Sequence, residues 1–154
     1  MMTTVRTILL AEDNENDAEL TLAALRSNRV ANDVVVVRDG AEALDYLYRR
    51  NSFADKEFER PALILLDLKM PKIDGLEVLR QIKNDAALKT IPVVMLTSSR
   101  EETDLFRTYD LGVNAYVVKP VEFTSFMEAV KVLGQFWAVI NESPPAGAPE
   151  VNGS

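Results

Sequence analysis

The chain has 154 residues, of which 47% are hydrophobic, enough for one domain with a substantial core. Its 17 lysines and arginines are outnumbered by 24 aspartates and glutamates, and the net charge of −7 argues against a surface that neutralises nucleic-acid phosphates. Cysteine and histidine are both absent, which excludes disulfides, thiolate chemistry and the usual zinc ligands. No apolar run approaches the ~18 residues that a membrane span needs, so we expect a soluble protein without a targeting segment, and the absence of cysteine suits the reducing cytoplasm.

Apolar runs alternate with amphipathic stretches along the whole chain. The first run, residues 5–11, precedes a stretch at 16–29 whose apolar residues recur at helical spacing. The same pair recurs four more times, which predicts five strand-helix units. The expected strands are residues 5–11, 33–37, 62–66, 92–97 and 115–118, and the expected helices are 16–29, 40–50, 75–85, 100–112 and 122–140. The connection at 51–60 is longer than the others and is expected either to extend the second helix or to form a loop.

The expected strands read as nearly continuous Val, Ile and Leu, which is typical of a parallel sheet covered by helices on both faces. Right-handed crossovers then predict an α/β fold: a doubly wound five-stranded parallel sheet in the flavodoxin-like order 2-1-3-4-5, with five helices. We expect this domain to occupy residues 5–140. Residues 141–154 include three prolines and two glycines and are expected to form a disordered tail, which leaves no room for an effector domain.

Chemically active side chains follow the expected strands. In an open parallel sheet, sites form at the carboxyl ends of the strands, and here those ends carry Glu12 and Asp13, Asp67, Thr97 and Lys119. The order places strands one and three side by side, about 4.8 Å apart, so three carboxylates share one pocket and either raise one another's pKa or require a cation. Oxygen ligands without histidine or cysteine favour Mg²⁺.

Magnesium in proteins commonly binds one or two carboxylates together with a phosphate. Asp67 is then a candidate nucleophile that forms an aspartyl phosphate, since a carboxylate is already ionised at neutral pH. Lys119 is placed to pair with a phosphoryl oxygen, and the Thr97 hydroxyl can donate a hydrogen bond to another. Phosphoryl transfer mainly requires positioning and charge neutralisation, so the absence of histidine is no obstacle.

Four segments in this order resemble the receiver domain of two-component response regulators, the CheY-like domain. They are AED at 11–13, LLDLKMPKIDG at 65–75, VVMLTSS at 93–99 and AYVVKP at 115–120. The similarity extends over roughly residues 5–140, and the set of motifs is highly specific. The length of the second connection and the segment LKTIPVVMLTSS look most similar to the small stand-alone regulators that partner bacterial phytochromes.

The resemblance implies a role for each site residue. Asp67 would accept a phosphoryl group from a sensor histidine kinase or a phosphotransfer protein. Mg²⁺ would be held by Glu12, Asp13 and Asp67, with help from the backbone carbonyl of Lys69. Lys119 would contact the phosphoryl group, and the peptide bond before Pro120 would be cis.

The resemblance further implies that Thr97 and Tyr116 are the switch residues. The protein would be a phosphoacceptor that takes part in its own phosphoryl transfer and hydrolysis, and not an enzyme with a separate substrate. Its output would pass through contacts with a downstream protein, with no part for nucleic acid or membrane. The kinase, the stimulus, the target and the lifetime of the phosphoryl group are not predicted.

Simpler interpretations compete with these roles. Asp13 and Asp74 are both in position to cap a following helix, and for Asp74 capping is the preferred interpretation. Asp67 could end its strand as an ordinary turn residue, Lys119 could be a solvated surface lysine, and Tyr116 could be a half-buried strand aromatic.

Rival functions belong to other classes of protein. A flavodoxin-like cofactor-binding protein needs a phosphate-cradling loop after strand one, but that loop is acidic here. A haloacid-dehalogenase-type phosphatase uses Asp-x-Asp at the end of its first strand, whereas Lys69 follows Asp67 two residues later. A receiver fold that acts as a phosphorylation-independent docking module retains the same residues and remains the alternative.

The last expected helix carries more apolar surface than one packed face needs. Most of its apolar side chains fall on a single stripe at helical spacing, as ordinary core packing requires. Phe136, Val139 and Ile140 lie around the helix from that stripe, near the end of the domain. We therefore consider a homodimer that involves this C-terminal helix.

Overall fold

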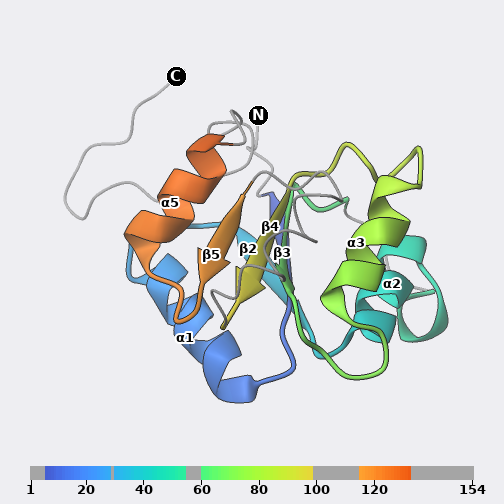
Figure 1. Ribbon diagram of the computed structural model, residues 1–154, viewed down its shortest axis with the longest axis horizontal. Helices are drawn as coiled ribbons and strands as arrows, with labels where there is room; N and C mark the ends of the chain where they lie inside the picture. The colour runs from blue at the N-terminus through green and yellow to red at the C-terminus, as the bar shows by residue number, and fades with distance from the viewer. Residues whose placement is uncertain (1–5, 29, 55–59, 99–114, 133–154) are drawn as a thin grey trace.

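Five parallel strands form the centre of the computed structural model, which describes residues 6–28, 30–54, 60–98 and 115–132 (Figure 1). The strand order is β2-β1-β3-β4-β5, and all four pairings are parallel, which confirms the predicted fold class and topology. The elements in chain order are β1 (Thr7–Ala11), α1 (Glu15–Arg26), β2 (Asp33–Val37), α2 (Gly40–Tyr48), a short 3₁₀ helix η1 (Asn51–Phe53), β3 (Leu63–Asp67), α3 (Gly75–Lys83), β4 (Val93–Thr97), β5 (Tyr116–Val118) and α5 (Phe123–Val132).

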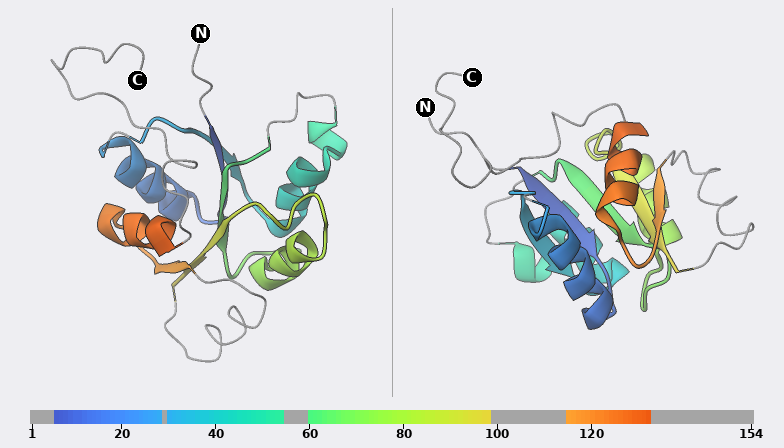
Figure 2. Two further views of the ribbon diagram at one scale, coloured as in Figure 1. Left: turned by 90° about the horizontal axis from the view of Figure 1, so that it is seen from above. Right: turned by 90° about the vertical axis from the view of Figure 1, so that its left-hand side faces the viewer.

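Helices cover both faces of the sheet. Figure 2 shows α1 and α5 on one side and α2 and α3 on the other, with the strands between them. Successive residues of β1 face opposite layers: Ile8 and Leu10 pack with α1 and α5, and Leu9 and Ala11 pack with α2 and α3. Because both faces are covered, every residue of β1 is buried, which explains the continuous apolar runs in the sequence.

Some predicted elements fall on residues that the structure does not describe. These are the fourth helix, expected at 100–112, the last turns of the fifth, 133–140, and the tail at 141–154. In the described part of the long connection, α2 does not continue: it ends at Tyr48, Arg49 adopts a left-handed conformation, and η1 follows. Within the described ranges, no helix is long and apolar enough to cross a membrane.

Side chains cap three of the described helices at their N-termini: Asn14 for α1, Asp39 for α2 and Asp74 for α3. The Asp74 carboxylate accepts a hydrogen bond from the Glu77 backbone N–H at 2.9 Å, which confirms the capping role preferred for it. The corresponding alternative for Asp13 is wrong, because the cap of α1 is Asn14, whose side chain accepts from the Asp17 backbone N–H at 2.9 Å. Asp13 is therefore left at the end of β1, beside the sheet.

Candidate functional site

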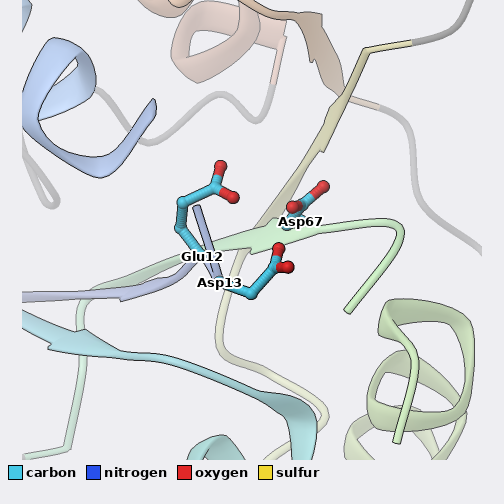
Figure 3. A group of neighbouring side chains, drawn as sticks. All are labelled: Glu12, Asp13 and Asp67. Atoms are coloured by element: carbon cyan, nitrogen blue, oxygen red, sulfur yellow. The ribbon is translucent and has the colours of Figure 1, made fainter. Parts of the chain in front are cut away.

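The register of the sheet brings the predicted residues to one edge. Ala11 lies beside Leu66, Asp67 beside Leu96, and Thr97 beside Val118. The side chains that end these strands therefore lie at one level of the sheet. Figure 3 shows Glu12, Asp13 and Asp67 gathered there, the first two directly after β1 and the third at the end of β3.

These three carboxylates form one compact group. One oxygen from each lies within 4.8 Å of the other two. Glu12 is fully buried and Asp67 is 4% exposed, whereas Asp13 is open to solvent. Such a set, with one solvent-facing ligand and only oxygen donors, fits a hard divalent cation.

The backbone of Asp67 is held by the start of α3. A Cβ atom added to Gly75 would lie 2.1 Å from the Asp67 carbonyl oxygen, far inside van der Waals contact. The Gly75 N–H also donates to the Leu68 carbonyl at 2.9 Å. Glycine at this position therefore allows α3 to begin directly against the end of β3.

Lys119 enters the same pocket from the end of β5, and its side chain is only 9% exposed. Its ammonium nitrogen lies 2.9 Å from Glu12 Oε1, 3.0 Å from Asp17 Oδ2 and 3.2 Å from Asp67 Oδ2. Burial acts to lower the pKa of Lys119, but the hydrogen bonds to Glu12 and Asp17 and the charge of Asp67 raise it above its ordinary value. The interpretation of Lys119 as a solvated surface lysine is therefore wrong.

Asp67 experiences opposing electrostatic effects. Burial, a hydrogen bond with Glu12 and the charge of Glu12 raise its pKa from 3.8 to about 7, while Lys119 acts to lower it. Without a bound cation, these effects oppose the ionisation of Asp67 that its expected role as a nucleophile requires. One ammonium group does not balance the surrounding carboxylates, so the structure supports the argument that the pocket requires a further cation.

The remaining predicted residues lie around this pocket. Thr97 ends β4 and is 3% exposed, and its carbonyl accepts from the Lys119 backbone N–H at 2.7 Å. Tyr116 begins β5, half-buried, beside Met95. The Lys69 backbone N–H lies 3.4 Å from Asp67 Oδ1, and the peptide bond between Lys119 and Pro120 is cis, as the resemblance implies.

Asp17 was not predicted as part of the site, although its carboxylate contacts Lys119. It lies in the first turn of α1, which begins only a few residues after β1. A short β1 to α1 connection places the first turn of that helix near the end of the strand. This spacing was the signal that could have identified Asp17.

The chain belongs to the family of response regulator receiver domains, whose family model matches residues 8–131. The response regulator Rcp1 of Synechocystis sp. is 38% identical over 132 residues, which are 86% of this chain and 88% of Rcp1. A solved structure of the Mn²⁺-bound form of Rcp1 covers 90% of this chain and 99% of that one, with a TM-score of 0.71 and 36% identity.

Two further solved structures are also similar. The bacteriophytochrome response regulator AtBRR has a TM-score of 0.83 and 59% identity, and the match covers 91% of this chain and all of AtBRR. The phosphorylated cyanobacterial phytochrome response regulator RcpA has a TM-score of 0.72 and 45% identity, with 88% and 95% of the two chains covered. The similarity to phytochrome response regulators therefore covers nearly the whole chain.

Proposed function

We propose that the protein is a single-domain response regulator that accepts a phosphoryl group on Asp67 from a sensor histidine kinase in a Mg²⁺-dependent reaction. The observation that carries this proposal is the buried Asp67 carboxylate, grouped with Glu12 and Asp13 and 3.2 Å from the Lys119 ammonium. On this proposal, residues 5–140 form the receiver domain, residues 141–154 form a tail, and the protein acts in the cytoplasm.

The chemistry of Asp67 is nucleophilic. One of its oxygens forms a bond to phosphorus while the bond from phosphorus to the imidazole nitrogen of the donor breaks. The electron pair of the broken bond stays with that imidazole, which the donor protein supplies. Asp67 must be ionised to attack, so the raised pKa of the cation-free carboxyl makes cation binding part of its activation.

Glu12, Asp13 and Asp67 are the side chains that would hold Mg²⁺, and the carbonyl of Lys69 is the proposed backbone ligand. The bound ion would neutralise charge on the transferring group. Support for a divalent cation comes from the oxygen-only donor set and from the Mn²⁺-bound form of the relative Rcp1. The phosphorylated form of the relative RcpA supports phosphorylation.

Signalling would follow from Thr97 and Tyr116. In this proposal the Thr97 hydroxyl donates a hydrogen bond to the new phosphoryl group, and Tyr116 repacks beside it. The change shifts a pre-existing equilibrium of the β4 and β5 side of the domain toward the form that binds a downstream protein. The similarity to phytochrome regulators makes a phytochrome kinase the first donor to test.

Transfer from such a kinase tests the proposal. A bacterial phytochrome kinase is labelled on its histidine with radioactive phosphate and mixed with this protein in Mg²⁺. The label should move to the wild type and to Asp74→Asn, which keeps the cap of α3, but not to Asp67→Asn. If Asp67→Asn takes up label equally, Asp67 is not the acceptor; if Asp67→Asn keeps full signalling in cells, the docking-module alternative is correct.

A further inference from the structure

Among the described residues, the Lys119 ammonium group forms one ion pair outside the proposed phosphoacceptor pocket. An ammonium group has three N–H donors, and here three carboxylates surround it: Glu12 Oε1 at 2.9 Å, Asp17 Oδ2 at 3.0 Å and Asp67 Oδ2 at 3.2 Å. Glu12 and Asp67 belong to the pocket, whereas Asp17 projects from α1 and takes no part in the chemistry proposed above. The lysine is thus shared between the pocket and the first helix.

The three contacts occupy every donor of the ammonium group. A phosphoryl group on Asp67 adds acceptor oxygens beside the lysine. The N–H now directed at Asp67 can turn to one of them, because the phosphorylated side chain no longer carries the carboxylate charge, but a second phosphoryl oxygen is reached only if Lys119 also releases Glu12 or Asp17. The Glu12 side chain is fully buried, so no solvent could replace a lost ion pair with the lysine. The Asp17 side chain is 31% exposed and can be hydrated again when it is released.

We propose that Asp17 is a positioning residue for Lys119. Its carboxylate holds the ammonium group toward α1 in the unphosphorylated protein and competes with the phosphoryl group for the same N–H. Phosphorylation then transfers that donor from Asp17 to a phosphoryl oxygen, and α1 loses a contact with the site. The inference rests on the proposed function, because it requires Lys119 to pair with a phosphoryl group on Asp67.

The chain offers a matched control for the charge of Asp17. Glu15 lies in the same first turn of α1, is exposed and carries the same charge. None of the Lys119 contacts that the structure describes involves Glu15. Glu15→Gln therefore removes one negative charge near the pocket, together with the favourable interaction of that charge with the helix N-terminus. The contact between Lys119 and Asp17 stays intact.

Binding of beryllofluoride, a phosphoryl mimic that attaches to a carboxylate, measures the competition directly. Its affinity is measured by titration calorimetry at a Mg²⁺ concentration that saturates each variant, for the wild type, Asp17→Asn, Asp17→Ala and Glu15→Gln. We expect Asp17→Asn to bind about threefold to tenfold more tightly than the wild type, because it removes a partly exposed charged partner of the lysine. Asp17→Ala should gain at least as much, since it keeps no acceptor, and Glu15→Gln should match the wild type.

The outcomes separate this inference from the function on which it rests. Unchanged or weaker binding by Asp17→Asn and Asp17→Ala would overturn the inference alone. If Asp17 were purely structural, both variants would bind beryllofluoride more weakly, and if Asp17 had no role, the affinity would not change. An equal gain in Glu15→Gln would also overturn it, since general charge would then explain the effect. If the wild type binds no beryllofluoride in Mg²⁺, the proposed function fails, and the inference fails with it.

Discussion

Asp67 connects the stability of the protein to its chemistry at the scale of single residues. Its pKa rises from 3.8 to about 7 on folding without a cation, first because of burial and then because of Glu12. Between those values the folded state binds more protons than the unfolded state, so this group's contribution to stability is fully present below pH 3.8 and is lost as the pH rises through about 7.

Asp67→Asn should remove this pH dependence, because the amide does not ionise. In the presence of a chelator at pH 8, we expect the free energy of unfolding of Asp67→Asn to exceed that of the wild type by about 1–3 kcal/mol. This range is smaller than the free energy that corresponds to the whole pKa shift, because the variant also loses the ion pair between Asp67 and Lys119. The difference should shrink as the pH falls to 4, and urea denaturation at both pH values measures it. A variant that is less stable than the wild type at pH 8 would contradict the expected cost of the buried charge.

The side chains at the strand ends were predictable because their positions follow from the sheet alone. Once the strand order was known, Glu12, Asp13, Asp67 and Lys119 had to meet at one edge. The contact between Lys119 and Asp17 was not predicted, because it depends on the path of a lysine side chain and on the start of α1. The pKa of Asp67 was also not predictable, since it depends on the depth of burial.

At the scale of elements, Gly75 sets how closely α3 approaches the end of β3. Gly75→Ala would place a methyl group 2.1 Å from the Asp67 carbonyl oxygen, so the start of α3 or the end of β3 must move. We expect this variant to lose about 1–3 kcal/mol of stability and to accept phosphate more slowly, because the Asp67 backbone shifts. Thermal denaturation and the transfer assay measure the two effects.

Gly40→Ala is the control for that experiment. Its added methyl group would lie 1.9 Å from the Ile73 carbonyl oxygen, a similar clash between the start of α2 and the loop before α3. We expect a comparable loss of stability with a smaller effect on transfer, since Asp67 is not the group displaced. An equal loss of transfer in both variants would mean that stability alone, and not the position of Asp67, governs the rate.

The bounds of the elements were predicted less well than their existence. β2 was predicted without error at residues 33–37, but β3 extends one residue further than expected and includes Asp67 itself. The helix expected at 16–29 begins at Glu15, because Asn14 provides the cap, and ends at Arg26. Apolar periodicity locates the centre of an element, whereas hydrogen bonds that involve polar residues decide its ends.

At the scale of the whole molecule, the parallel sheet was predictable because short continuous apolar runs that alternate with helical stretches are typical of strands buried on both faces. The layers then follow from the alternation of side chains along each strand. The predicted self-association through the C-terminal helix concerns residues 133–140, which lie outside the described part of the chain, and it stays a prediction. A monomer by sedimentation, with and without phosphorylation, would contradict it.

Cation binding should stabilise the entire fold, because the ion binds the assembled pocket and not the unfolded chain. At a Mg²⁺ concentration ten times the dissociation constant, we expect a gain of about 1.4 kcal/mol, or a rise of about 3–6 °C in Tm. Asp13→Asn should lose most of this rise, whereas Glu15→Gln should retain it. Equal rises in both variants, measured by calorimetry, would place the cation elsewhere.

The intact mass of the protein after incubation with acetyl phosphate tests the central claim most directly. The wild type should gain one phosphoryl group in Mg²⁺ and none in chelator, and Asp67→Asn should gain none in either. A phosphoryl adduct on Asp67→Asn, or no adduct on the wild type with Mg²⁺ bound, would contradict the claim that Asp67 is the phosphoacceptor of this protein.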